Sequence, residues 1–163
     1  MHLPFLKLEP SFQVIPISSL YFLILLLLIL LLQETFASII DKLSEAGSWH
    51  LLLEYELPRR QKRPDAIIFA NDIVIVIEFK FEAEHYDSSS QWQAREYMMD
   101  LRDFHEESRD RIIIPILCAT HAPERDCSLV QLKSGTEALR YANKNNLVRV
   151  ILECYNSGHN APR

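Results

Sequence analysis

The chain has 163 residues, of which 48% are hydrophobic and 24% are charged, and its net charge is −5. This size and composition are typical of one globular domain with its own core. The acidic balance excludes an overall basic field that attracts nucleic acid. The three cysteines have no CxxC spacing, which argues against a disulfide framework or a zinc site, and no GxxxxGK loop of an ATP-driven motor occurs.

An apolar segment precedes the rest of the chain. No charged residue lies between Pro10 and Gln33, and residues 20–32 are uninterruptedly apolar. A run of this length fits a membrane-spanning helix, a signal peptide, a buried or partner-packed helix, or a non-native leader. We therefore expect residues 1–32 to be a hydrophobic leader or membrane segment, with residues 14–32 as the membrane contact. Because the segment lacks a periodic polar face, we expect a helix with few contacts to a sheet.

The remaining elements predict an α/β domain over residues 33–154. Phe36, Ile39, Ile40 and Leu43 have the spacing of one helix face. Residues 51–57, which Pro58 ends, are predicted as a first strand. β-Branched runs predict strands over 65–70 and 73–81, joined by a turn at 71–72. Three serines predict the start of a helix over 91–107. A fourth strand over 111–118, a helix over 136–145, a fifth strand over 148–154 and a frayed polar tail over 155–163 complete the prediction.

This order predicts how the strands pair. The first three strands can form an antiparallel meander, because short turns join them. The fourth follows a helical crossover and can therefore join in parallel. We expect a mixed central β-sheet flanked by helices, with Cys118 in the core.

Charged residues stand where two apolar strands begin or end. Asp65 opens the second strand after Pro64, whereas Glu78 and Lys80 lie two positions apart on the third strand and so share a face. Charges beside so apolar a run are costly unless a partner or an ion compensates them. Two carboxylates and an ammonium group at one sheet edge suit a divalent metal ion and a charged catalytic lysine.

In this element order, Asp65, Glu78 and Lys80 resemble the signature of the PD-(D/E)XK nucleases, which have a restriction-endonuclease-like αβββαβ core. Residues 93–97 resemble the Q-x-x-x-Y motif of the exonuclease branch. Several strings are also similar to a nuclease-like domain that precedes a superfamily 1 helicase in a bacterial family, among them Lys62-Arg63-Pro64-Asp65, Ile77-Glu78-Phe79-Lys80 and residues 97–105. This sequence departs from that family in its leucine-rich leader and in having no helicase segment.

The resemblance implies a metal-dependent nuclease that hydrolyses phosphodiester bonds in DNA, with RNA as the alternative substrate and Mg²⁺ or Mn²⁺ as cofactor. Asp65 and Glu78 would bind the metal, with the backbone carbonyl of Phe79 as a further ligand. Glu34 would take the place of the family's first-helix acid.

The resemblance also assigns roles to residues around the metal. Lys80 would hold or deprotonate the attacking water, or stabilise the charge of the transition state. Gln93 would orient a ligand or the nucleophile, and Tyr97 would pack beneath it. Phosphate contacts are expected from a basic stretch that contains Arg59, Lys62 and Arg63.

Simpler interpretations remain open for each position. Asp65 could cap a turn, Glu78 and Lys80 could form a strand-end ion pair, and Gln93 could be a surface residue. The basic stretch over 59–63 could be an ordinary solvated turn. Glu54 and Glu56 are interpreted as solvated or helix-paired, and Trp92, Met98 and Met99 as packing residues.

The alternative function is a non-catalytic module that keeps the nuclease fold for binding or assembly, tethered to a membrane in one version. The acidic net charge and the missing motor favour it, whereas the presence of all three charged positions favours catalysis. Expected partners are nucleic acid, a helicase acting in trans and a membrane. The expected location is the cytoplasm, with or without membrane association.

Overall fold

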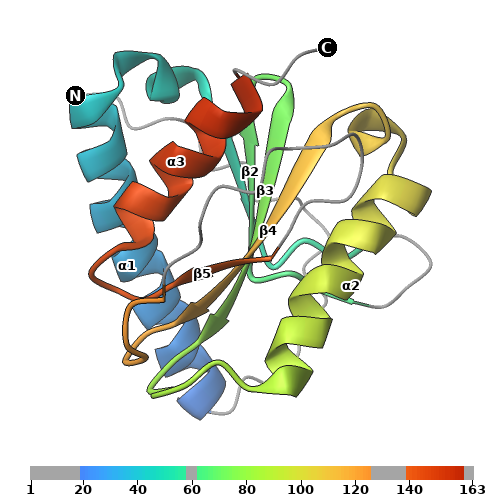
Figure 1. Ribbon diagram of the computed structural model, residues 1–163. Helices are drawn as coiled ribbons and strands as arrows, with labels where there is room; N and C mark the ends of the chain where they lie inside the picture. The colour runs from blue at the N-terminus through green and yellow to red at the C-terminus, as the bar shows by residue number, and fades with distance from the viewer. Residues whose placement is uncertain (1–18, 58–61, 126–138, 160–163) are drawn as a thin grey trace.

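The computed structural model describes residues 19–57, 62–125 and 139–159. A five-stranded mixed sheet lies between helices, with α1 and α3 on one face and α2 on the other (Figure 1). The fold is therefore the mixed α/β architecture that the sequence predicts. In chain order the elements are α1 (Ser19–Lys42), the 3₁₀ helix η1 (Ser44–Ser48), β1 (His50–Leu53), β2 (Ala66–Ala70), β3 (Ile73–Lys80), α2 (Ser88–Phe104), the 3₁₀ helix η2 (Glu106–Ser108), β4 (Ile112–Ala119), β5 (Arg140–Ala142) and α3 (Leu147–His159).

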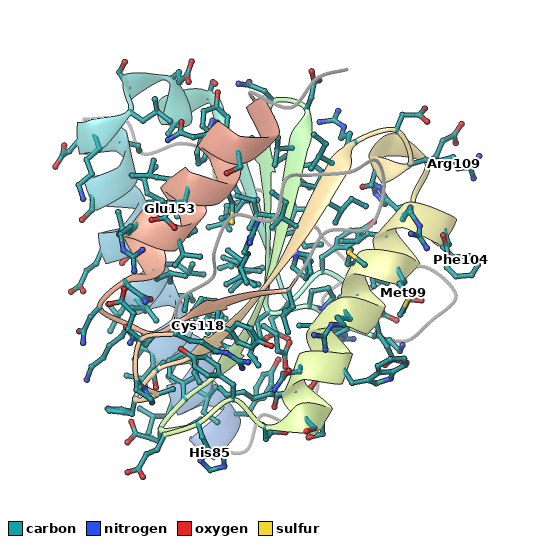
Figure 2. All side chains as sticks on the ribbon, viewed as in Figure 1. His85, Met99, Phe104, Arg109, Cys118 and Glu153 are labelled. Atoms are coloured by element: carbon teal, nitrogen blue, oxygen red, sulfur yellow. The ribbon has the colours of Figure 1, made fainter. Side chains whose placement is uncertain are left out.

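The strands lie in the order in which the chain forms them. β1, β2 and β3 pair antiparallel, β4 joins β3 in parallel after the α2 crossover, and β5 pairs in parallel with β4. The expected meander and crossover are thus confirmed. β3 and β4 are buried on both faces, which explains their nearly continuous aliphatic sequences. Cys118 projects from β4 into the core on the α1 face, as predicted (Figure 2).

The leucine-rich segment is part of the domain. α1 runs without a break from Ser19 to Lys42, and Leu28 and Leu32 are buried in the same core as the β3 residues Ile75 and Ile77. Helical spacing turns one leucine face of this segment inward. α1 packs mainly against α3 and η1, so the expectation of few direct contacts with the sheet is confirmed even though the helix belongs to the core. The predicted face farther along α1 is confirmed, with Ile39 buried and its predicted neighbours packed against the same core.

The outward face of the first turns of α1 remains apolar. Exposed large hydrophobic residues gather there: Phe22, Leu23, Ile24, Leu26, Leu27 and Leu30. Among the described residues, α1 is the one helix whose length and composition would allow it to cross a bilayer, a test that core helices and signal sequences also pass. Leu28 and Leu32 lie on the opposite, inward side of the helix, in the protein core.

The predicted fifth strand over 148–154 is wrong, because these residues form α3. Leu147, Val150, Ile151, Cys154 and Tyr155 recur at helical spacing and are all buried. The β-branched composition of the segment suggested a strand, but its periodicity is that of an amphipathic helix. The predicted frayed tail is wrong up to His159 for the same reason.

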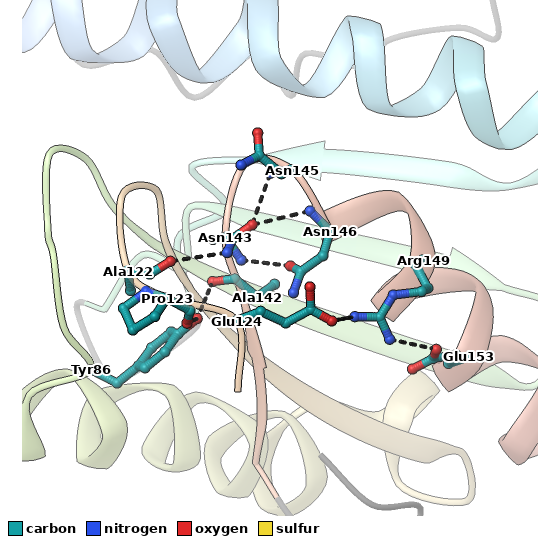
Figure 3. A network of polar contacts seen from close by, with 10 residues as sticks. All are labelled: Tyr86, Ala122, Pro123, Glu124, Ala142, Asn143, Asn145, Asn146, Arg149 and Glu153. Atoms are coloured by element: carbon teal, nitrogen blue, oxygen red, sulfur yellow. Dashed lines mark hydrogen bonds and ion pairs between the residues drawn. The ribbon is translucent and has the colours of Figure 1, made fainter. Parts of the chain in front are cut away.

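Two asparagines fix the start of α3 (Figure 3). The Asn143 side chain accepts from the amides of Asn145 and Asn146 at 2.9 and 3.1 Å, while the Asn146 side chain accepts from the Asn143 amide at 2.7 Å. This reciprocal arrangement satisfies backbone donors that a helix start leaves unpaired. The helix predicted over 136–145 is wrong at residues 140–142, which form β5. Residues 126–138 lie outside the described residues.

Two further predictions differ in detail. The first strand ends at Leu53 instead of residue 57, since Glu54 has a left-handed backbone with a φ of 49°, and Leu57 makes an isolated bridge with Lys62. Trp92, which was interpreted as a packing residue, is exposed. Phe104, at the end of α2, is also exposed and points outward (Figure 2).

We predict that Leu32→Ala destabilises the protein by about 2–5 kcal/mol, because the truncation leaves a cavity in the core. Leu32 is 1% exposed, whereas Leu30, two residues earlier on the same helix, is 48% exposed. Leu30→Ala is therefore the matched control and should change the free energy of unfolding little. Urea denaturation measures both, and equal effects would contradict the core position of α1.

Candidate metal and catalytic site

The β2–β3 hairpin positions the predicted acidic pair. Ala66 pairs with Ile77, so one step outward Asp65 lies opposite Glu78. Asp65 and Glu78 are each two positions from Ile67 and Val76, respectively, and side chains two apart on a strand share a face. Both carboxylates therefore lie on the face of the sheet that packs against α2. The Asp65 carboxylate accepts a 2.6 Å hydrogen bond from the Phe79 amide, which fixes it beside the end of β3.

A chain of hydrogen bonds joins β3 to α2. The Lys80 ammonium donates to Glu78 Oε1 at 2.8 Å and to Gln93 Oε1 at 3.0 Å. Gln93 Nε2 in turn donates to the Tyr97 hydroxyl at 2.9 Å, and this hydroxyl donates to the Arg63 carbonyl at 3.3 Å. The structure therefore brings together five predicted residues: Asp65, Glu78, Lys80, Gln93 and Tyr97. Gln93 and Tyr97 are four residues apart and so lie on the same face of α2, toward β3.

The two carboxylates perturb each other. Burial, followed by the charge of Glu78, raises the pKa of Asp65 to about 8 against the lowering effect of the Phe79 amide. Burial also raises the pKa of Glu78, while the Lys80 ammonium lowers it. Near neutral pH, the metal-free site therefore retains a proton on Asp65, because two buried anions side by side are unfavourable.

With both carboxyl groups ionised, one oxygen of this pair has no hydrogen-bond partner among the described residues. Without metal, the Asp65 proton is the donor available to Glu78. Glu78 is 4% exposed, and its Oε2 atom is buried without a partner. An unsatisfied buried carboxylate oxygen costs free energy, which a cation shared with Asp65 would offset. The donor set therefore fits a hard divalent cation. In the described part of the chain, no three acidic, histidine or cysteine side chains form a cluster that could hold a metal, so backbone oxygen and water would have to complete its coordination.

The structure does not bring Glu34 to this pair. Glu34 is exposed on α1, and it lies thirteen residues beyond Tyr21, whose hydroxyl reaches the end of β1 near Asp65. That separation is about 20 Å along the helix axis. The first helix thus presents a tyrosine, not the predicted acid, at this end of the sheet.

Two of the residues predicted to contact phosphate, Lys62 and Arg63, are already paired with carboxylates. The Lys62 ammonium lies 3.1 Å from Asp100 and 3.2 Å from Glu96, both on α2, and Arg63 contacts Glu56 at 2.8 Å. Arg59 lies outside the described residues. A phosphate would therefore have to displace a carboxylate from Lys62 or Arg63 to bind there.

Sequence reasoning missed two residues near the pair. Glu54 follows β1 and was interpreted as solvated or helix-paired, yet its charge raises the pKa values of both Asp65 and Glu78. Tyr21 donates a 3.0 Å hydrogen bond to Glu54 Oε2. An antiparallel register could have found Glu54, but no local signal in the leucine run indicates Tyr21.

Comparison with known proteins does not identify a family for this chain. No protein-family model, curated protein or solved structure matches the chain. The function therefore depends on the contacts and electrostatics of the residues around Asp65, Glu78 and Lys80.

Without metal, we predict that stability decreases as the pH rises from about 5 to about 9. The folded protein holds a proton on Asp65 up to a pKa of about 8, while the unfolded chain releases it at the ordinary, much lower value. The folded state therefore binds more protons, and each contributes a slope of about 1.4 kcal/mol per pH unit.

Asp65→Asn should flatten this dependence, because an amide does not titrate. Urea denaturation in EDTA over that pH range measures the effect, with the exposed Asp41→Asn as the charge-matched control. A variant with the unchanged slope of the wild type would contradict the raised pKa.

Proposed function

We propose that this protein is a metal-dependent nuclease with a restriction-endonuclease-like core that hydrolyses phosphodiester bonds in DNA. The observation that carries the proposal is the pair formed by the half-buried Asp65 and the buried Glu78, with an unpartnered carboxylate oxygen on Glu78 and the Lys80 ammonium beside it. The predicted element order from α1 to β4, which places this pair at the end of the hairpin, supports the core assignment.

Asp65, Glu78 and the carbonyl of Phe79 would hold Mg²⁺ or Mn²⁺. When bound, the ion would polarise the scissile phosphate and activate a water molecule. Its charge would also remove the repulsion between the two carboxylates, so that Asp65 would lose its proton on metal binding.

In this proposal, Lys80 is positioned to stabilise negative charge near the metal. Two of its three N–H donors are used by Glu78 and Gln93, and its side chain is 31% exposed. The remaining donor can reach a phosphate oxygen or a water. Because two oxygen acceptors hold the ammonium group, we favour holding the water or stabilising negative charge over deprotonating the water.

Gln93 and Tyr97 position Lys80 in this proposal. Gln93 accepts from the lysine and donates to Tyr97, so that its amide orientation is fixed at both ends. Arg63 and Lys62 would contact DNA phosphates once these have displaced Glu56 and the α2 carboxylates. Such exchange makes binding weak and sensitive to salt.

The pairing of these cations favours the second candidate, a binding module without catalysis. Lys62 and Arg63 are neutralised by neighbouring carboxylates, which lowers the attraction for nucleic acid. In that case Asp65, Glu78 and Lys80 would serve only to join β3 to α2. A cleavage assay separates the two candidates.

We predict Mg²⁺-dependent cleavage of linear DNA, measured on single- and double-stranded substrates labelled at both ends. Asp65→Ala should abolish cleavage, and Lys80→Met should lower the rate by about 10²–10³-fold, because it removes a charge at the reacting phosphate. Glu34→Gln, which removes an exposed carboxylate far from the pair, is the control and should cleave like the wild type. Activity that persists in Asp65→Ala would assign the cleavage to another source.

We also predict that Mn²⁺ or Mg²⁺ stabilises the folded protein, since only the folded chain brings Asp65 and Glu78 together. At a metal concentration 100 times the dissociation constant the gain is about 2.7 kcal/mol. Thermal unfolding with and without metal measures it. Glu78→Gln should lose the gain while Glu34→Gln keeps it, and an equal gain in both variants would place the bound metal elsewhere.

A further inference from the structure

Three acidic residues stand in one row across the sheet. Leu53 pairs with Ala66, and the Glu54 amide donates to the Asp65 carbonyl at 3.1 Å, so the pairing of β1 with β2 continues to Glu54. Asp65 in turn lies opposite Glu78 on β3. Directly opposed residues in a sheet have Cβ atoms about 5 Å apart, so Glu54 begins close to the acidic pair.

Glu54 keeps an unusual backbone to reach its position. Its φ of 49° is in the left-handed region, which costs a residue other than glycine about 1 kcal/mol or more. Its side chain is fixed from the other side by Tyr21, whose hydroxyl donates to Oε2 at 3.0 Å. A strained glutamate held by a contact from a distant helix indicates a position that the fold maintains.

A second observation favours a cation at this row. With both carboxyl groups ionised, Glu78 Oε2 is buried with no donor among the described residues, while Oε1 is occupied by Lys80. Glu54 adds a further negative charge nearby and supplies no donor. The row therefore concentrates carboxylate charge around an oxygen that lacks a partner.

We propose that Glu54 is a third carboxylate of the metal site and that Tyr21 is the residue that positions it. The inference rests on the proposed metal binding by Asp65 and Glu78. Since no three such side chains are arranged to hold an ion directly in the described structure, Glu54 acts on the ion through a bound water. Mg²⁺ and Mn²⁺ retain waters when bound by few carboxylates, and a carboxylate that accepts from such a water orients it.

The leucine-rich helix then has a role at the site as well as in the core. Tyr21 lies at the start of α1, and Leu28 and Leu32 anchor the same helix against the sheet. The Tyr21 hydroxyl is thus carried to Glu54 by a helix whose position the core determines.

The test measures Mn²⁺ affinity by isothermal titration calorimetry on the full chain. Glu54→Gln keeps an oxygen acceptor for Tyr21 but removes the charge, and should weaken Mn²⁺ binding by about 10–100-fold. Tyr21→Phe should weaken binding less, and the double variant should bind no more weakly than Glu54→Gln alone, because both changes act on one carboxylate. Glu34→Gln, on the same helix as Tyr21, is the control and should bind like the wild type.

The outcomes separate this inference from the proposed function. If the wild type binds no Mn²⁺, both fail. If Asp65→Ala abolishes binding and Glu54→Gln binds like the wild type, only the role of Glu54 fails. If the effects of Tyr21→Phe and Glu54→Gln add in full, or Tyr21→Phe has no effect, Tyr21 does not position Glu54. Thermal unfolding of each variant without metal shows that it is folded.

Discussion

The antiparallel register of β2 and β3 determines where the charged residues of this protein lie. A shift of one residue would move Asp65 to the opposite face from Glu78. The turn prevents that shift, because Asn71 takes a left-handed conformation and is held from both sides. Its side chain donates to the Tyr155 hydroxyl at 2.9 Å, and its carbonyl accepts from Arg111 at 2.6 Å. The acidic pair is thus fixed by contacts at the far end of the hairpin.

Helix α2 completes the arrangement by polar contacts as well as by packing. Asp87 caps its first turn by accepting from the Ser90 amide at 2.9 Å, which sets the register in which Gln93 meets Lys80. At the other end of the site, Lys62 ties the segment before β2 to Asp100. Because the same helix contacts both the lysine and the lead-in to Asp65, a displacement of α2 would separate the lysine from the acids.

Local patterns predicted the parts of the structure that depend on local geometry. The two-residue alternation of strands and a short turn place Asp65, Glu78 and Lys80 together. The helix that carries Gln93 and Tyr97 was predicted too, but Asp87 caps it, and the three serines that were expected to precede it form its first turn. The character of α3 was also present in its spacing, but β-branched residues such as Val148 and Val150 obscured it. The contact between Tyr21 and Glu54 could not be predicted, since it joins segments 33 residues apart through the docking of a whole helix.

The position of α1 against α3 has a consequence for how the chain is made. Leu28 and Leu32 share their core with Leu147 and Ile151, and beyond α1 Tyr155 hydrogen-bonds to Glu45 across 110 residues. A ribosome therefore releases an apolar helix roughly ten seconds before the helix that shields it, at ordinary rates of synthesis. During that interval α3 does not yet cover the leucines of α1 that it packs against in the folded protein. The residues that resemble a hydrophobic leader in the sequence are thus the residues of α1 that join the core once the chain has folded.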